Sequence, residues 1–251
     1  MPQKEWFATW FDSPYYHLLY QHRDDNEAKL FLDHLVQKLA LPNTARILDL
    51  ACGKGRHSLT LAQMGFEVVG ADLAPNSISA AQEQAEKLGV KNVEFCVHDM
   101  RQAMETSPFD AVFNLFTSFG YFEALADNHK VCASIATMLA PNGIVVIDFF
   151  NAQKVSQNLV AEESVSRGDI NFEIKRWASD THIFKQISIQ DPQHDQTIGP
   201  YTERVQALSL SDFQELLEPS FDLLNTYGSY DLAPFNPENS DRLILIAKKK
   251  P

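Results

Sequence analysis

Residues 47–57 read ILDLACGKGRH, an apolar strand that carries an acidic residue and runs into a glycine-containing loop and a helix. The side chains of Ala51, Gly53 and Gly55 are small or absent, so a ligand can approach the backbone of this loop closely. The helix that follows presents backbone amides at its start, which favours a nucleotide-like ligand there. A tight strand-to-helix turn without a ligand needs one glycine, but it gives no reason for Asp49.

Two further acidic residues end the next two strands that the sequence predicts. Asp72 follows Gly53 by 19 residues, and a carboxylate at this place can accept hydrogen bonds from both hydroxyls of a ribose. Asp99 ends the following strand, where a carboxylate can accept from the exocyclic amine of adenine while Met100 packs against the base. Because the carboxyl ends of parallel strands share one edge of a sheet, the loop and the two acids predict a site for an adenosyl compound.

Short apolar runs alternate with helix-like stretches around this loop, which predicts a parallel sheet covered by helices on both faces. After residue 151 the apolar period changes to two, which predicts an antiparallel hairpin and a third strand beside it. We expect strands at residues 46–50, 67–72, 93–98, 109–115, 143–149, 169–177, 181–190, 201–210, 221–227 and 242–248. We expect helices at residues 27–39, 55–64, 75–88 and 129–139, and one from an N-cap at Ser211 to Leu217, with a turn at 141–143.

The charge balance bears on the partners of the protein. The formal net charge is −12, whereas a nucleic-acid binder normally presents a basic face. Residues 248–250 form the only run of basic residues, and we interpret them as a solubilising tail. We therefore expect no nucleic-acid partner.

Composition excludes several other classes of protein. With 45% hydrophobic residues the chain can bury a sizeable core, so disorder throughout is excluded. Its apolar runs are far shorter than the ~20 residues of a membrane span, and residues 1–20 lack the unbroken apolar stretch of a signal peptide. The cysteines at 52, 96 and 132 are widely spaced and form no CxxC pair, which favours reduced thiols. We expect a cytoplasmic protein without a membrane partner or a metal site.

Residues 48–55 resemble the first motif of the class I S-adenosylmethionine-dependent methyltransferases, with Ala51 where a first glycine is commoner. The resemblance covers about residues 44–150. The other motifs follow in the family's order: residues 68–73 are similar to the ribose-binding strand, 96–100 to the adenine motif, 109–114 to the fourth strand, and 139–143 to a turn before the fifth, with two substitutions.

The resemblance extends to a subgroup that acts on small molecules, through residues 55–57 and 118–122. Members of this subgroup carry an antiparallel insertion after the fifth strand. The implied fold is α/β, a Rossmann-like, doubly wound, seven-stranded, mostly parallel sheet with an antiparallel last strand. We expect one methyltransferase domain over residues 1–251, with a cofactor-binding core at 44–154 and 211–251, a helical lid segment at 1–43, and an antiparallel β insertion over the active site at 155–210.

The implied cofactor is S-adenosyl-L-methionine, and the implied product is S-adenosyl-L-homocysteine. Aromatic residues are dense in the first 20 positions, where they can form a lid over a sulfonium, whose positive charge is attracted to aromatic faces. Tyr121 is the polar candidate for a catalytic residue, and Arg23 and Arg56 are candidates to pair with the cofactor carboxylate. We expect the cofactor to contact Asp49, Ala51, Gly53, Gly55, Arg56, Asp72, Leu73, Asp99, Met100, Leu115, Phe116 and Tyr16.

The acceptor site is less well defined by the sequence. The family resemblance suggests that the insertion overhangs the site, where Glu173, Arg176, Trp177 and His182 are its polar and aromatic side chains. Period-two alternation turns about half of such a set away from the site. Other wall candidates follow the fourth strand, at residues 114–118.

The predicted reaction is an in-line displacement that moves the methyl group to an N or O atom of a small molecule. Positioning in a dry site supplies much of the acceleration, and a neutral amine needs no base, whereas a hydroxyl acceptor benefits from one. A methyltransferase acting on RNA, DNA or protein, and a non-catalytic adenosyl-binding protein, remain alternatives. A nicotinamide-dependent oxidoreductase is disfavoured because its glycine fingerprint, begun at Gly53, fails at Ser58. Oligomeric state stays open.

Overall fold

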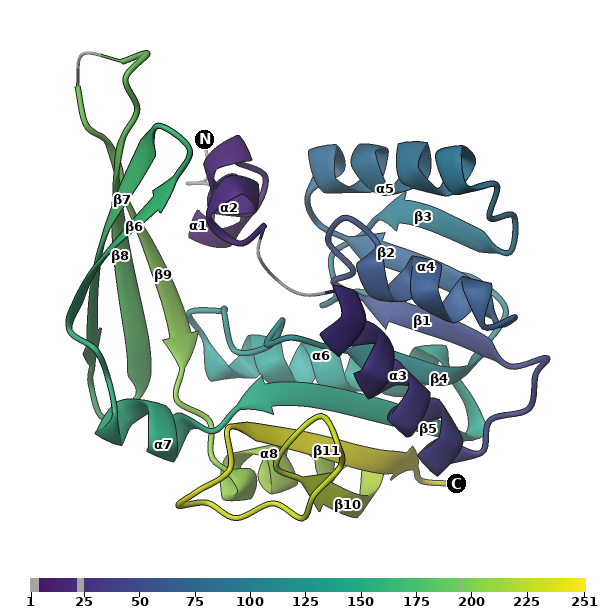
Figure 1. The fold of residues 1–251 in the computed structure, drawn as a ribbon. Coiled ribbons are helices and arrows are strands. Elements are labelled where there is room, and N and C mark those ends of the chain that lie inside the picture. Colours follow the sequence, from purple (N-terminus) through teal and green to yellow (C-terminus); the bar gives the residue numbers. More distant parts are fainter. Residues whose placement is uncertain (1–4, 22–24, 195) are drawn as a thin grey trace.

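The computed structural model describes residues 5–21, 25–194 and 196–251. Its strands are β1 (Arg46–Leu50), β2 (Glu67–Asp72), β3 (Val93–Val97), β4 (Phe109–Asn114), β5 (Leu139–Phe150), β6 (Glu162–Arg167), β7 (Ile170–Ala178), β8 (His182–Gln190), β9 (Ile198–Gln206), β10 (Phe221–Tyr227) and β11 (Arg242–Lys249). Seven of these strands form one sheet in the order β10-β11-β5-β4-β1-β2-β3 (Figure 1). The other four form a separate sheet in the order β6-β7-β8-β9.

The direction of the strands follows the expected pattern. β1 pairs in parallel with β2 and β4, β2 with β3, and β4 with β5. β11 runs antiparallel to both β5 and β10. The predicted fold class, a mostly parallel seven-stranded sheet with an antiparallel last strand and a small antiparallel insertion, is therefore confirmed.

Helices cover both faces of the seven-stranded sheet. The helices are α1 (Trp6–Trp10), α2 (Pro14–Leu19), α3 (Asp25–Leu39), α4 (Arg56–Gln63), α5 (Pro75–Leu88), α6 (Leu125–Met138), α7 (Ala152–Gln157) and α8 (Leu210–Leu217). One apolar cluster joins α3 and α4 to one face of the sheet, and a second cluster joins α6 and α8 to the other face. Among the described residues, no helix is both long and apolar enough to cross a membrane.

Alternation along each central strand divides the core into these two layers. Successive side chains of a strand point to opposite faces, and in β1 Ile47 packs with Phe31 and Leu61 while Leu48 packs with Val131. Strands buried on both faces read as unbroken apolar runs, which is why β1 and β2 begin and end at the predicted residues. All the parallel strands direct their carboxyl ends to one edge of the sheet.

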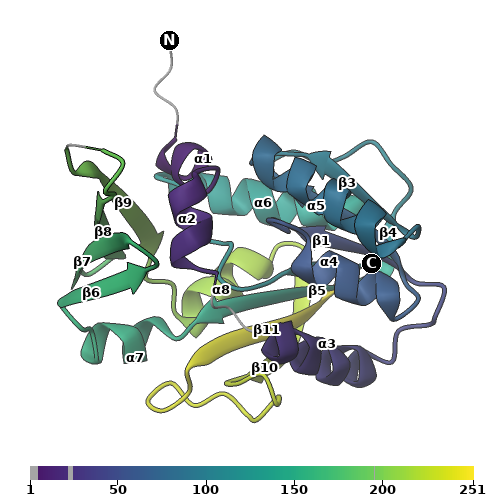
Figure 2. The same cartoon turned by 45° about the horizontal axis from the view of Figure 1, so that its top comes forward.

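The amino-terminal helices lie at that edge. In both views α1 and α2 lie between the four-stranded sheet and the carboxyl edge of the larger one (Figures 1 and 2). A third apolar cluster joins these helices to the four-stranded sheet. Its buried residues are Trp10, Leu19, Phe172, Ile174, Ile187 and Ile189. The insertion therefore packs directly against the amino-terminal segment.

Several predicted boundaries are wrong, each for a local reason. The helix predicted with Ser211 as its N-cap begins two residues earlier, because Ser209 is the N-cap and forms a capping box with Asp212. The predicted turn at 141–143 lies inside β5, and α6 begins at Leu125 rather than His129. β6 was not predicted, because its residues are polar and mostly exposed and it gains its structure by pairing with β7.

Candidate active site

The glycine loop between β1 and α4 is held against the end of β2. The φ angles of Ala51, Gly53 and Gly55 are 64°, 57° and 77°, so three positions of the loop lie in the left-handed region. The amides of Ala51 and Cys52 donate to the carbonyl of Ala71 at 2.7 and 3.0 Å. The Gly53 amide donates to Asp72 Oδ2 at 2.8 Å. The loop is thereby fixed beside the carboxylate that the sequence assigns to the ribose.

A cavity of about 430 Å³ lies between this loop and the amino-terminal helices. Its volume is in the range of about 300–1,000 Å³ that is usual for small-molecule sites. Eleven of the predicted site residues line it: Ala51, Gly53, Arg56, Asp72, Leu73, Asp99, Met100, Leu115, Phe116, Tyr16 and Tyr121. Arg23 lies outside the described residues.

Other residues of the cavity wall were not assigned to a site by the sequence. They are His17, Gln21, Cys52, Lys54, His57, Ser77 and His98. Four of them lie inside the motif stretches 47–57 and 96–100, and two more neighbour an aromatic residue of the amino-terminal segment. The same wall contains Phe7, Phe11, Tyr20, Ser118 and Phe122, which the sequence places in the aromatic lid or after the fourth strand.

Two predicted cofactor contacts, Asp49 and Gly55, are not part of the cavity wall. Asp49 is 1% exposed and accepts a hydrogen bond from the Ser58 hydroxyl of α4 at 2.5 Å. Burial raises the pKa of Asp49 to about 6, although the Ser58 hydrogen bond opposes the shift. A Cβ atom on Gly55 would lie 2.7 Å from ring atoms of Phe95. Asp49 therefore supports the loop through α4, and Gly55 packs the loop closely against β3.

Asp72 has a structural contact on each side and also faces the cavity. Its two oxygens accept from the amides of Gly53 and Ala74, each at 2.8 Å. Burial raises the pKa of this carboxyl group, and the two amide hydrogen bonds oppose the shift.

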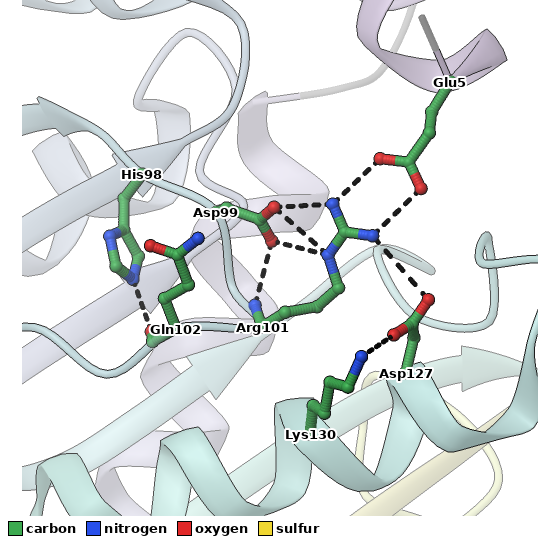
Figure 3. A network of polar contacts seen from close by, with 7 residues as sticks. All are labelled: Glu5, His98, Asp99, Arg101, Gln102, Asp127 and Lys130. Carbon is green, nitrogen blue, oxygen red and sulfur yellow. Dashed lines mark hydrogen bonds and ion pairs between the residues drawn. The ribbon is translucent and has the colours of Figure 1, made fainter. Parts of the chain in front are cut away.

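Asp99 lies at the end of β3 and is bound by a neighbouring arginine. Arg101 donates from its side chain to both oxygens of Asp99, at 2.6 to 3.1 Å (Figure 3). Burial tends to raise the pKa of Asp99, but the hydrogen bonds from Arg101 outweigh it, so that the pKa lies below its ordinary value. Asp99 is therefore an ionised acceptor in the cavity wall.

The segment after β4 has an unusual backbone. Phe116 and Thr117 have φ angles of 57° and 63°, a conformation that is costly for side chains of this size. The Phe116 amide donates to Asp148 Oδ2 at 2.9 Å, and the Thr117 amide donates to the Asp148 carbonyl at 2.9 Å. Arg242 pairs with Asp148 at 2.7 Å and donates to the Thr117 hydroxyl at 3.0 Å. A buried ion pair thus shapes this wall of the cavity.

The wall candidates after β4 divide into two groups. Leu115, Phe116, Ser118 and Tyr121 face the cavity, whereas Asn114 and Thr117 are not in its wall. Asn114 is buried and its amide donates to the Leu50 carbonyl. The Tyr121 hydroxyl donates to the Thr117 carbonyl, so this ring is held with one edge anchored and one face toward the aromatic lid.

The amino-terminal helices form the opposite wall. The amides of Asn76 donate to Asp12 at 3.0 and 2.9 Å, which joins this segment to α5. Trp10 and Tyr20 donate to Glu203 of β9 at 2.7 and 2.9 Å. The segment is therefore bound on one side to the core and on the other to the insertion.

The insertion itself contributes no residue to the cavity wall within the described part of the chain. Glu173 accepts from Ser164, and Arg176 pairs with Glu163 across neighbouring strands. Trp177 stacks on Phe184 at 5.1 Å. The structure does not bring these predicted side chains, or His182, to the cavity. In the described ranges no cluster of three or more His, Cys, Asp or Glu side chains suits a metal ion.

A family model described as a methyltransferase domain matches residues 42–198. The chain belongs to this family, and it is a class I S-adenosylmethionine-dependent methyltransferase. Its cofactor is S-adenosylmethionine, and the cavity wall contains a glycine loop and two strand-end carboxylates, groups that can bind an adenosyl compound.

The names of the relatives indicate different methyl acceptors. A glycine/sarcosine N-methyltransferase of Halorhodospira halochloris is 31% identical over 90% of this chain and 83% of its own length. A tRNA 5-carboxymethoxyuridine methyltransferase of Escherichia coli is 30% identical over 52% of this chain and 49% of its own. The crystal structure of an S-adenosylmethionine-dependent methyltransferase from Clostridium acetobutylicum has a TM-score of 0.79 at 19% identity and covers 93% of this chain and 95% of that one.

The chain spans about half the length of several of the curated relatives that it matches. Two of the curated relatives are matched over 47% and 59% of their own length. These sequence matches thus cover about half of each of the two relatives, and the structural likeness at 19% identity concerns the fold.

Replacing the buried carboxyl group of Asp49 with an amide should stabilise the protein by an amount that depends on pH. Its pKa is about 6 in the folded protein against 3.8 ordinarily, so the folded state binds the extra proton and ionisation of Asp49 opposes folding as pH rises from about 4 to 6. Relative to wild type, Asp49→Asn should gain free energy of unfolding across this window, reaching roughly 1–3 kcal/mol above pH 6. Urea unfolding between pH 4 and 7 measures the difference.

The exposed hairpin residue Asp180 provides the control. Asp180→Asn should show no such pH-dependent difference. A difference for Asp49→Asn that does not grow with pH would contradict the raised pKa.

Replacing Asp72 should weaken cofactor binding. Asp72→Ala removes a charged acceptor from the cavity wall and should weaken binding of S-adenosylhomocysteine by about 1.5–3 kcal/mol. Calorimetric titration measures the affinity, and urea unfolding separates the cavity effect from loss of the Gly53 and Ala74 bonds. Unchanged affinity in this variant would refute a ribose-binding role.

Proposed function

We propose that this enzyme methylates an N or O atom of a small molecule. The observation that carries the proposal is the position of the cavity between two walls, which come from the core on one side and from α1, α2 and the residues after them on the other. An acceptor must fit beside the cofactor within about 430 Å³, which suits a small molecule. The formal net charge of −12 also disfavours a polyanionic acceptor.

Residues already in the wall suit each part of the cofactor. We assign the ribose hydroxyls to Asp72, the exocyclic amine of adenine to Asp99, and the flanks of the base to Leu73 and Met100. The backbone of the glycine loop and the side chain of Arg56 suit the amino-acid end. When bound, the cofactor supplies an activated methyl group.

The acceptor wall is aromatic. Tyr16 lies 4.9 Å from Phe11 and 4.8 Å from Tyr20, and Phe11 lies 5.1 Å from Tyr121, measured between ring centroids. Such a wall excludes water and attracts the positive charge of a sulfonium or of a developing ammonium group. These residues position the acceptor in line with the methyl group.

The titratable groups of the wall favour a nitrogen acceptor that arrives neutral. Within the described wall the carboxylates are Asp72 and Asp99, which are both assigned to the cofactor. Burial, with help from the charge of Lys54, lowers the pKa of His17 to about 4, so this ring is neutral at pH 7. A neutral amine needs no base, whereas a hydroxyl acceptor would use a group such as His17.

A macromolecular acceptor is the alternative, because one relative is named for a tRNA substrate. The test supplies S-adenosylmethionine with small amines and amino acids, small hydroxyl compounds, or bulk tRNA, and measures S-adenosylhomocysteine formed. We expect turnover with a member of the small-molecule sets. Turnover with tRNA alone would overturn the proposal, and cofactor binding without turnover in any set would favour a non-catalytic protein.

Tyr121 offers a second test of the acceptor wall. Tyr121→Phe keeps the ring but removes the hydroxyl that anchors it to Thr117, so kcat should fall about tenfold, less than the ~10²–10⁴ of a general base. The affinity for S-adenosylhomocysteine should stay unchanged. Tyr227→Phe, on β10 outside the cavity wall, is the matched control. A loss beyond a hundredfold would instead make the Tyr121 hydroxyl a catalytic group.

A further inference from the structure

We propose that Arg101 is a positioning residue that orients Asp99 for adenine and, through Glu5, fastens the amino-terminal helices over the same site. The inference rests on the adenine-binding role proposed for Asp99. It concerns a residue outside the cavity wall and outside the motifs that the sequence singles out.

Arg101 fixes the orientation of the Asp99 carboxylate. The Arg101 amide donates to Asp99 Oδ1 at 3.0 Å, Nε donates to the same oxygen at 3.0 Å, and Nη2 donates to Oδ2 at 2.6 Å. Three donors on one short side chain leave it no freedom to turn. A carboxylate has about four lone-pair directions, so Asp99 can still accept from an amine in the cavity that it lines.

The outer edge of the same guanidinium group binds Glu5. Arg101 Nη1 and Nη2 donate to the two oxygens of Glu5 at 2.9 and 2.8 Å, as a two-pronged pair (Figure 3). Glu5 is the N-cap residue of α1, and α1 places Phe7 in the cavity wall. The Cζ atom of Arg101 also lies 4.7 Å from the centroid of the Phe122 ring. The ring centroids of Phe122 and Phe7 are 5.5 Å apart.

The balance of charge makes Arg101 necessary to this arrangement. Glu5, Asp99 and Asp127 surround its guanidinium group, with Asp127 at 3.7 Å. Among the described residues, Lys130 pairs with Asp127, at 2.7 Å. Without Arg101, the carboxylate of α1 would face that of the adenine site with no cation between them, so attraction between lid and core would become repulsion.

Coupling follows because one group makes both contacts. Docking of α1 orders the guanidinium group that holds Asp99, and a cofactor that engages Asp99 and Phe7 favours the docked helix. Such coupling is reciprocal between the two sites. Since the Glu5 side chain is 40% exposed, its contact is the weaker of the two and is screened by salt.

The test compares S-adenosylhomocysteine with S-inosylhomocysteine, in which an oxygen replaces the exocyclic amine. Calorimetry gives both affinities, and stopped-flow fluorescence of the tryptophans of α1 gives the dissociation rate. Arg101→Gln should lower the affinity for S-adenosylhomocysteine about tenfold and erase most of the preference over the inosine analogue. Arg101→Lys keeps the positive charge but lacks the planar, two-pronged guanidinium group. It should recover only part of the affinity and part of the preference for the adenine compound.

Glu5→Gln should separate the two functions. It should keep the preference for the adenine compound, because Asp99 stays bound to Arg101, and should speed dissociation about two- to fivefold at low salt. At about 0.5 M salt, where the Debye length is short, this difference should vanish. Lys130→Gln, which alters a residue that contacts this network through Asp127, should behave as wild type.

The outcomes are distinct. Full preference for the adenine compound in Arg101→Gln, or an unchanged dissociation rate in Glu5→Gln at low salt, would overturn the inference. Equal loss of both ligands in Arg101→Gln would also overturn it, since a merely structural role has that result. Wild-type protein with no preference would refute the adenine role of Asp99, whereas the nature of the methyl acceptor does not affect these readouts.

Discussion

The bonds between the glycine loop and the end of β2 are the constraint on which the site depends. The amides of Ala51, Cys52 and Gly53 all donate to residues 71 and 72, and these bonds hold a loop that contains three left-handed positions. At Ala51, which is not a glycine, the left-handed backbone is costly and persists only where its surroundings over-determine it. Because the Asp72 carboxylate both holds the loop and faces the cavity, the shape of the loop and the polarity of the site cannot change independently.

The amino-terminal helices, which the sequence predicts as a lid, lie between the cavity and the insertion (Figure 1). Residues of α1, α2 and the adjoining segment line the cavity, whereas the four-stranded sheet packs behind them and donates none of the described wall. Trp10 and Tyr20 meet on Glu203 of that sheet. The insertion reaches the cavity wall through the helices that it supports and through Gln206 of β9, whose side-chain amide donates to the carbonyl of the wall residue Phe122.

The central strands were predictable because burial on both faces leaves a strong local signal. β1 and β2 have the predicted bounds, whereas the exposed edge strand β6 has no apolar pattern and depends on β7 for its hydrogen bonds. The orientation of Asp49 was not predictable in the same way. It shares a strand face with Ile47 and so points to α4 and Ser58, which becomes apparent only when the layer above that face is known.

The cofactor class and the central strands were readable from the amino-acid sequence alone, because a glycine loop, strand-end acids and buried apolar runs each express themselves within a few consecutive residues. The acceptor wall, the support of the lid and the setting of Asp99 emerged only from the folded chain. Glu5 meets Arg101 across 96 residues and Trp10 meets Glu203 across 193. Contacts of this kind leave no local pattern, since they arise from the packing of segments whose own structures do not depend on them.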